Sequence, residues 1–472
     1  MTAPLEAVLV GAGNRGADVY GAWALAHPDQ MVITAVAEPV EGRRRAFAAR
    51  HGIPPERQFT TWEDLFARPQ LARAAIIATQ DQMHTGPALA ALKAGYDVLL
   101  EKPMAHRLDE CIRLVQAAER TGRVLQVCHV LRYTDFFRRV YEIVRSGRLG
   151  QVITVSHREN VSALHMAHSY VRGNWRRADE ASPMILAKCC HDLDLLYWIL
   201  GQRCVRLSSV GGLTHFRPEN APPGAPDRCL EGCPVAESCP FYAPALYDRA
   251  EPVFAALARA RKPVYRLIGR LGLRDPQAVE RLAGVVPALQ GIFEFRRSVR
   301  AIIAEDPDDP ESVHRALLNG PYGRCVYHCD NDVVDHQIVA MEFEGGVSAS
   351  LTMHGHSHEE GRTLRVDGSR ATLLGKLSAS EAWLEIHEHR GVAVERIEMA
   401  GEIEAGRHGG GDDRLMTAFV AALQGGEQAP LTSARASLES HLMAFAAEQA
   451  RVEGQVIEMD AFRAEAEKLG ER

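Results

Sequence analysis

The first residues whose types and spacing suit chemistry are the glycines of a turn near the N-terminus. Gly11, Gly13 and Gly16 follow an apolar run at residues 5–10 and precede a helical pattern at about 15–27. Between a strand and a helix, a GxGxxG turn allows close approach to a pyrophosphate, which the helix N-terminus then binds through free N–H groups. The motif therefore predicts a dinucleotide site, with Asn14 and Arg15 as further contacts. A plain glycine turn without a ligand is the alternative.

Glu38 ends the second apolar run, about 20 residues beyond the glycines, where an acid accepts hydrogen bonds from the adenosine ribose hydroxyls. A carboxylate there repels a 2′-phosphate, which favours NAD over NADP. The three arginines at 43–45 argue the other way, since one of them could reach such a phosphate.

Lys102 follows a fourth apolar run, within Glu101-Lys102-Pro103. Parallel sheets bind ligands at the carboxyl ends of their strands, and an amine beside a cationic nicotinamide ring has a lowered pKa. Such an amine can exchange the proton of a hydroxyl as hydride leaves the same carbon. The alternative is an ordinary surface lysine on a strand-to-helix loop.

His191 lies in a helical pattern with Asp194 one turn later, and residues three apart share a helix face. We expect Asp194 to fix the tautomer of His191, which would act as a general base toward a hydroxyl. A buried structural histidine is the alternative.

Together with the run ATQDQMHTGPALAALKAGYDVLLEKP, these residues resemble the Gfo/Idh/MocA family of NAD(P)-dependent sugar and polyol oxidoreductases. The resemblance covers nearly the whole chain except an insertion. It implies that Lys102 lies beside nicotinamide and substrate, that His191 is catalytic, and that a cis peptide precedes Pro103. It also implies cofactor contacts from Thr79, Gln80, His84, Glu101, Lys102, Trp175 and Arg176.

One position departs from the family pattern. The Asp expected four residues before His191 is Ala187, and Lys188 follows it. The proton relay is therefore incomplete, and we expect Lys188 to bind an anionic group or to orient a hydroxyl. Donors and aromatics that suit a carbohydrate are dense nearby, which predicts the following substrate contacts: His129, Arg132, Tyr133, His165, His168, Tyr170, Arg172, Lys188 and Asp194.

The elements that must position these residues fall into two parts. Residues 1–124 alternate strand and helix patterns, which predicts a Rossmann domain with a doubly wound parallel sheet. Residues 125–472 change to period-two strands with a hairpin at Gly345 and Gly346 and a helical tail, which predicts an α+β domain with a largely antiparallel sheet. Residues 215–331 fit neither pattern and are expected to form an insertion.

The insertion has two features of its own. Cys229, Cys233, Cys239 and Cys325 predict a structural Zn²⁺ or an iron–sulfur cluster, with buried or unpaired thiols as an equal alternative and disulfides last. Residues 255–274 contain six Lys and Arg and no acid. They could bind an anionic partner, although a solvated helix face is the simpler interpretation.

The 472 residues carry a formal net charge of −7, which argues against nucleic acid as a partner. Without an apolar run of membrane-spanning length or a signal-like start, we expect a cytoplasmic protein that binds no membrane. The open sheet of the second part predicts a homo-oligomer. The leading function is NAD-dependent oxidation or reduction of a sugar, polyol or cyclitol hydroxyl. The alternatives are an NAD-dependent glycoside hydrolase with transient oxidation, and a non-catalytic NAD-bound sensor.

Overall fold

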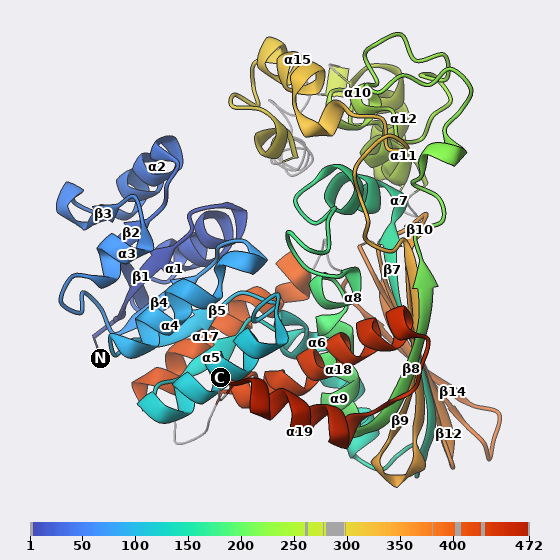
Figure 1. Cartoon of the computed structure of the whole chain (residues 1–472). Helices are drawn as coiled ribbons and strands as arrows, with labels where there is room; N and C mark the ends of the chain where they lie inside the picture. Colours follow the sequence, from blue (N-terminus) through green and yellow to red (C-terminus); the bar gives the residue numbers. More distant parts are fainter. Residues whose placement is uncertain are drawn as a thin grey trace.

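The apolar runs of the N-terminal part form a parallel sheet in a computed structural model of the chain (Figure 1). The structure describes residues 3–470 except 260–262, 277, 280–296, 298, 380, 402–406 and 426–429. The sheet has the order β3-β2-β1-β4-β5-β6. Its strands are β1 (Leu5–Val10), β2 (Met31–Ala37), β3 (Gln58–Phe59), β4 (Ala74–Ile77), β5 (Asp97–Leu100) and β6 (Leu125–Val127).

Helices follow these strands as the alternation predicted, and the Rossmann fold is confirmed. They are η1 (Asn14–Gly21), α1 (Ala22–Ala26), α2 (Glu41–His51), α3 (Trp62–Phe66), η3 (Asp81–Met83), α4 (Thr85–Lys93) and α5 (Leu108–Thr121). Because β6 pairs with β5, the sheet extends three residues beyond the boundary predicted at residue 124. The outer edge of β6 is covered by the C-terminal part of the chain, where Val127 N donates to Thr432 O at 2.8 Å.

The second domain contains a nine-stranded sheet in the order β14-β13-β12-β11-β7-β10-β9-β8-β15. Only β7 and β10 pair in parallel, so the predicted largely antiparallel sheet is confirmed. Gly345 and Gly346, with φ of 77° and 84°, make the predicted hairpin turn. The strands are β7 (Val152–Ser162), β8 (Cys204–Gly212), β9 (His336–Phe343), β10 (Ser348–Ser357), β11 (Gly361–Gly368), β12 (Ala371–Ser378), β13 (Ala382–Glu388), β14 (Val394–Met399) and β15 (Ile457–Glu458).

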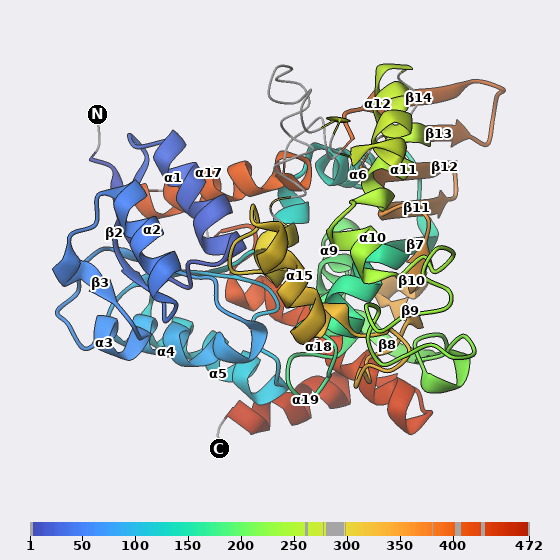
Figure 2. The same ribbon diagram turned by 90° about the horizontal axis from the view of Figure 1, so that it is seen from above.

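Helices lie between the two sheets and contact both domains (Figure 2). The long helix α18 packs on α9, on α5 of the Rossmann domain and on β8, and α19 packs on α5. The segments of this layer are η4 (Val130–Tyr133), α6 (Asp135–Arg145), α7 (Ala163–His165), η5 (Met166–Arg172), α8 (Met184–Ala187), α9 (Cys190–Leu200), α17 (Gly411–Gln424), α18 (Ala434–Glu453) and α19 (Met459–Gly470).

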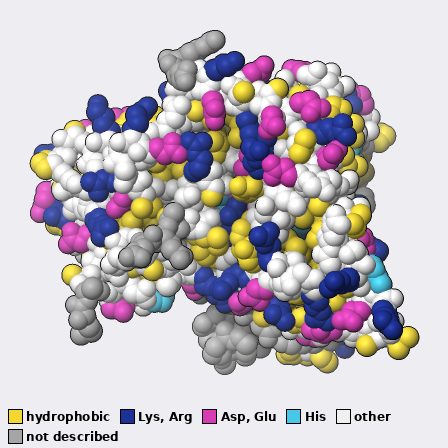
Figure 3. All heavy atoms as spheres, turned by 90° about the horizontal axis from the view of Figure 1, so that it is seen from below, with side chains coloured by type: hydrophobic (Ala, Val, Ile, Leu, Met, Phe, Trp, Pro, Cys, Tyr) yellow, Lys and Arg dark blue, Asp and Glu magenta, His cyan; other side chains and the backbone are white. Residues whose placement is uncertain are grey.

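The predicted insertion emerges between the neighbouring strands β8 and β9, and its described part combines short helices with long loops. It contains η6 (Pro218–Asn220), α10 (Ala243–Tyr247), α11 (Glu251–Arg259), α12 (Pro263–Arg274), α15 (Pro310–Asn319) and η8 (Pro321–Gly323). Arg261 and Lys262 of the basic stretch lie outside the described residues. Basic and acidic side chains are interspersed over the face in Figure 3. Among the described residues, no helix is both long and apolar enough to cross a membrane.

Candidate active site

The glycine turn between β1 and η1 has the geometry that its motif predicts. A Cβ on Gly11, whose φ is 90°, would lie 2.6 Å from the carbonyl oxygen of Ala78, and one on Gly16 would lie 1.9 Å from that of Gly11. A Cβ on Gly13 would have no heavy atom within 4 Å. The first and third glycines therefore serve close packing, while the second leaves the backbone open toward a ligand.

Glu38 is buried directly beside this turn. Its Oε2 accepts from Ala12 N at 2.8 Å and its Oε1 accepts from Val40 N at 3.0 Å. A carboxylate has about four acceptor positions, so two stay available for ribose hydroxyls. Of the three neighbouring arginines, Arg44 donates to the Glu38 carbonyl at 2.6 Å and Arg45 pairs with Glu41 on α2.

Other groups at the same end of the sheet fit a dinucleotide as well. The Thr79 hydroxyl, just after β4, is buried and has no hydrogen-bond partner among the described residues. A buried hydroxyl without a partner costs free energy, which a bound ligand would recover. Gln80 caps η3, and its side-chain oxygen accepts from Gln82 at 3.1 Å. The open backbone at Gly13, the Glu38 carboxylate and the Thr79 hydroxyl would hold the cofactor.

Arg15 and Glu101, predicted as cofactor contacts, lie against each other below this end of the sheet. Arg15 Nε donates to Glu101 Oε1 at 2.5 Å, and its Nη2 donates to Asp412 of α17 at 2.7 Å. Tyr20 also donates to Glu101. Burial opposes the charge of Glu101, but Arg15 and Tyr20 outweigh it and lower the pKa of this carboxyl. The cluster therefore fixes the strand end that precedes Lys102.

Lys102 reaches from the end of β5 to the second domain. The predicted cis peptide precedes Pro103, and Lys102 Nζ donates to the carbonyl oxygen of Ala187 at 2.9 Å. His84 lies between two carbonyls of this region, with Nδ1 at 2.8 Å from Pro103 O and Nε2 at 3.2 Å from Thr79 O. His84 thus connects the loop of Lys102 to the end of β4.

His191, on the first turn of α9, is 7% exposed at the same junction. Its ring centroid lies 5.5 Å from that of His129, which in turn lies 5.6 Å from that of His441. Burial and the nearby Arg132 hold the pKa of His129 well below its ordinary value, so this ring is neutral. His191, His129 and the unpredicted His441 therefore form a buried cluster of edge-to-face rings.

Asp194 pairs with a partner that its helix did not suggest. Both of its carboxylate oxygens accept from Arg132, each at 2.6 Å, in a buried bidentate pair. Arg132 also donates to Leu431 O at 3.0 Å, which connects α9 to the C-terminal segment. That Asp194 also orients His191 stays a prediction.

Several predicted substrate contacts bond to the protein itself. The Tyr133 hydroxyl is 3.3 Å from that of Thr432. His168 Nδ1 is 3.0 Å from the Tyr247 hydroxyl of the insertion, and burial lowers its pKa to about 4. Arg172 is buried against the insertion, and Arg176 pairs with Asp330 at 3.0 Å. The geometry gives these side chains a scaffold role.

The structure brings Tyr170, Trp175, His165 and Lys188 together opposite the end of β4. Trp175 Nε1 donates to Asp81 Oδ2 of the Rossmann domain at 3.1 Å, and its ring lies 6.1 Å from that of Tyr170. The Tyr170 ring lies 5.8 Å from that of His165. These aromatic faces suit the apolar face of a sugar ring.

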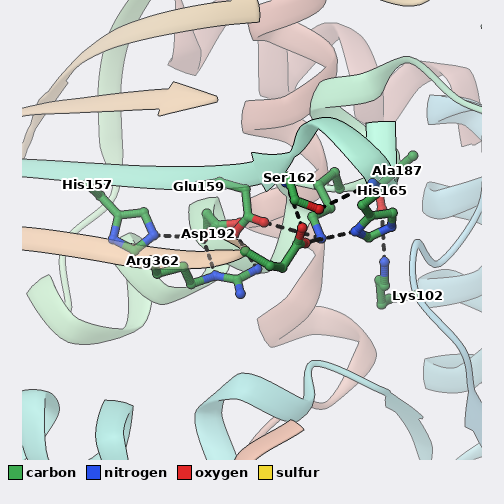
Figure 4. Close-up of polar contacts among 10 residues, drawn as sticks. Lys102, His157, Glu159, Ser162, His165, Ala187, Asp192 and Arg362 are labelled. Atoms are coloured by element: carbon green, nitrogen blue, oxygen red, sulfur yellow. Dashed lines mark hydrogen bonds and ion pairs between the residues drawn. The ribbon is translucent and has the colours of Figure 1, made fainter. Parts of the chain in front are cut away.

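Lys188 belongs to a charge network that runs into the second domain (Figure 4). Its Nζ is 3.2 Å from Glu159 and 3.0 Å from Glu360. Burial raises the pKa of Glu159 to about 7, while Lys188 and His165 overcome burial and lower that of Glu360. The expectation that Lys188 binds an anion is corrected, since two carboxylates already neutralise its charge.

Arg362 continues this network away from the junction. It contacts Glu159 at 2.6 Å and Asp192 at 2.8 Å, and Asp192 also accepts from His157 at 2.7 Å. Sequence reasoning missed Asp81, Asp192, Glu360, Arg362 and Asp412. Asp192 adjoins His191 in the sequence, which was a usable signal, whereas Glu360, Arg362 and Asp412 reach the site only through the tertiary fold.

The predicted metal site needs a correction. The described residues contain no group of three or more His, Cys, Asp or Glu side chains that could hold a metal ion. The four cysteines line a cavity of about 10 Å³ together with Arg172, which donates to Cys229 Sγ at 3.6 Å. Burial raises the pKa of Cys239 and Cys325, and metals bind thiolates. Arg172 therefore lies where a metal was expected, and the alternative of buried or unpaired thiols fits the described residues.

Comparison with known proteins matches this geometry to one family. Residues 5–129 match the oxidoreductase family model with an NAD-binding Rossmann fold, and residues 137–230 match the GFO/IDH/MocA C-terminal domain. Residues 289–459 match the C-terminal alpha/beta domain of the same oxidoreductase family. The chain belongs to the Gfo/Idh/MocA family of oxidoreductases.

Individual relatives differ in chemistry. YteT of Bacillus subtilis (strain 168) is 23% identical over 72% of this chain and 70% of its own length. An inositol 2-dehydrogenase of Corynebacterium glutamicum (strain R) is 29% identical over 43% of the chain and 57% of its own length. A glycosyl hydrolase family 109 protein of Saccharopolyspora erythraea is 30% identical over 46% and 50%. Apart from YteT, the chain thus spans little more than half of these relatives.

One solved structure illustrates the shared fold. An oxidoreductase of Agrobacterium radiobacter, in complex with NAD⁺, L-tartaric acid and magnesium, superimposes with a TM-score of 0.62 at 14% identity. The match covers 97% of this chain and 99% of that one. At this identity the likeness shows the fold alone.

Proposed function

We propose that this chain transfers hydride between a hydroxyl of a sugar, polyol or cyclitol and NAD, at the junction of its two domains. The observation that carries the proposal is the 2.9 Å contact of Lys102 Nζ with Ala187 O. It brings the lysine at the end of β5 to the residues that lead into α9, where His191 lies on the first turn. We infer that these two side chains, which come from different domains, lie near one substrate carbon where a Rossmann fold binds nicotinamide.

The protein groups have distinct tasks in this proposal. When bound, NAD accepts a hydride from the carbinol carbon. His191 takes the hydroxyl proton as a general base, and Lys102, held by Ala187 O, uses its remaining N–H bonds to orient the substrate oxygen. Trp175 and Tyr170 cover one face of the substrate ring, while the Arg15–Glu101 pair keeps the backbone of Lys102 in place.

A spectrophotometric assay tests the function. The chain is mixed with NAD and, separately, with myo-inositol, other cyclitols, polyols, aldoses and methyl glycosides. At least one of these should produce NADH in proportion to the substrate consumed. If none of these compounds is turned over although NAD binds, the result would favour a different function, that of a sensor that binds NAD without catalysis.

A redox-neutral glycosidase is the second candidate. Two relatives favour it, namely the family 109 glycosyl hydrolase and a 2,7-anhydro-N-acetylneuraminate hydratase of Escherichia coli (strain K12), 25% identical over 44% of this chain and 54% of its own length. The replacement of the family Asp by Ala187 also sets this site apart. Such an enzyme releases product from a glycoside while NADH absorbance stays flat. Deuterium at the oxidised carbon nevertheless slows it, which distinguishes it from an ordinary hydrolase.

We also propose that the chain forms a homo-oligomer through the outer face of the nine-stranded sheet. Val210 on β8 is 67% exposed, and Ile338 on the neighbouring β9 is 43% exposed. Adjacent apolar side chains on an open sheet face favour association. Light scattering after size exclusion should give a mass that is a multiple of 51.9 kDa. A V210E/I338E variant should elute at the monomer mass.

A further inference from the structure

Glu360 brings a carboxylate to the side of the site where position 187 has none. It follows β10 in the turn to β11, and its Oε1 is 3.0 Å from Lys188 Nζ. Lys188 directly follows Ala187, whose carbonyl holds Lys102. In the family pattern an Asp at position 187 would supply the negative charge beside Lys102. In this chain Glu360, from the turn between β10 and β11, supplies a negative charge instead. It does so through its contact with Lys188, the residue after Ala187.

The same oxygen of Glu360 holds His165. His165 Nδ1 donates to Glu360 Oε1 at 2.8 Å, and Glu360 Oε2 accepts from Ser162 N at 2.7 Å. Ser162 Oγ in turn accepts from His165 N at 3.2 Å. The three residues form a closed set of hydrogen bonds, so the imidazole is fixed before any ligand binds.

The remaining nitrogen of this ring is open. The His165 side chain is 36% exposed, and within the described part of the chain its Nε2 has no bonded partner. Through Glu360 the ring is connected to Lys188, which directly follows Ala187 in the chain (Figure 4). A carboxylate bound at Nδ1 leaves the proton-accepting lone pair on Nε2, as in a carboxylate–histidine pair of an acid–base catalyst.

We propose that His165, positioned by Glu360, is a second proton-transfer group of this site and takes over the role of the carboxylate missing at position 187. The inference rests on the proposed carbohydrate chemistry at Lys102 and His191. Neutral His165 accepts a proton at Nε2 from a substrate hydroxyl other than the one served by His191. The O–H bond breaks, its electron pair stays on oxygen, and the Nδ1–H remains bonded to Glu360. In the reverse step the imidazolium returns this proton to the oxygen.

The charges around His165 support proton exchange rather than anion binding. The groups that face it are Glu360 from the β10–β11 turn, Lys188 after α8, and Tyr170 and His168 from η5. Glu360 neutralises either Lys188 or a protonated His165, but not both. Above its pKa of about 7, Glu159, which also contacts Lys188, supplies the second negative charge. Protonation of His165 is therefore compensated locally, and no excess positive charge is left for an anionic ligand.

Carbethoxylation of the full chain by diethyl pyrocarbonate, followed by mass spectrometry, tests the open Nε2 without any substrate. His165 should react about as fast as His387, an exposed histidine paired with Glu385 on β13, whereas buried His129 and His441 should lag. An unmodified His165 under conditions that fully modify His387 would overturn the proposal, because a hydroxyl could not reach Nε2 either.

Kinetics on the substrate found in the NAD assay test the role. H165A should lower kcat by about 100-fold with the KM for NAD unchanged, and free imidazole should restore part of the rate. E360Q should lower kcat by about tenfold and should shift the pH profile of kcat. H387N is the matched control and should behave as wild type. If wild type turns over and H165A keeps kcat within twofold, only the role of His165 is refuted. If wild type turns over nothing with NAD bound, the proposed function and this role are both refuted.

Discussion

The ammonium of Lys102 lies 2.9 Å from the carbonyl oxygen of Ala187, so the Rossmann domain and the second domain touch through a catalytic candidate and a backbone group. Lys102→Ala and His191→Ala should each lower turnover by about 100-fold or more, because Lys102 orients the substrate oxygen and His191 is the general base. Calorimetry should show nearly unchanged NAD binding. Lys93→Ala, an exposed lysine on α4, is the control. Full activity of both site variants would refute the assignment.

Glu38 predicts cofactor choice. Thermal unfolding should show greater stabilisation by NAD than by NADP, because the carboxylate repels a 2′-phosphate. Glu38→Gln should reduce the difference between the stabilisation by NAD and that by NADP, because it removes the negative charge. The amide oxygen of Gln can still accept from a backbone N–H. Glu41 is an exposed neighbour on α2, and Glu41→Gln should leave the difference between NAD and NADP unchanged. Stronger stabilisation of the wild type by NADP would contradict the role of Glu38.

Breaking the buried Arg132–Asp194 pair should lower the free energy of unfolding more than breaking an exposed ion pair. Asp194→Ala leaves a guanidinium buried without its partner, which costs about 3–5 kcal/mol of unfolding free energy. The exposed pair Arg203–Glu344 is the matched control, and Glu344→Ala should cost about 1 kcal/mol or less. Urea unfolding monitored by fluorescence measures both. An equal loss of unfolding free energy in Asp194→Ala and Glu344→Ala would contradict the prediction, because the buried pair would then stabilise the fold no more than the exposed pair.

Glu159 predicts a pH dependence with a definite sign. Burial raises its folded-state pKa to about 7, above its ordinary value, so the folded protein binds the extra proton between about pH 4.5 and 7. Stability from this group is therefore lost as pH rises through that window, by at most about 1.4 kcal/mol per pH unit.

The matched variant tests this slope. Unfolding midpoints of wild type and Glu159→Gln, measured from pH 5 to 8, should diverge in favour of the variant as pH rises, because the amide stays neutral. The exposed Glu56→Gln should run parallel to wild type. A constant difference between wild type and Glu159→Gln across this range would contradict the raised pKa.

Local signals made much of this site predictable. The glycine turn, Glu38 and Lys102 each follow a buried strand directly, so the sequence around them carries strand, turn and helix together. His191 was recognised through its helix, whereas the pairing of Asp194 with Arg132 was not foreseen, because these two residues are 62 positions apart.

The partners that were missed depend on the tertiary fold. His165 and Glu360 are 195 positions apart, and Arg15 and Asp412 are 397 apart. Such contacts follow from strand register and helix packing rather than from any local pattern. The cysteines were misread for a related reason, since their spacing gave no sign that Arg172 would lie among them.

Residues from the C-terminal segments α17, α18 and α19 and from the loop before α18 pack against the Rossmann domain. Residues 432–433 lie along the outer edge of β6, α18 and α19 cover α5, and Asp412 holds Arg15. During synthesis the ribosome releases the Rossmann strands first, yet their unpaired edge stays open until more than 400 residues have emerged. The nascent chain therefore exposes a strand edge until residues 432–433 have emerged, a state in which chaperone binding protects against aggregation. A polypeptide cut after residue 129 would keep that edge exposed permanently.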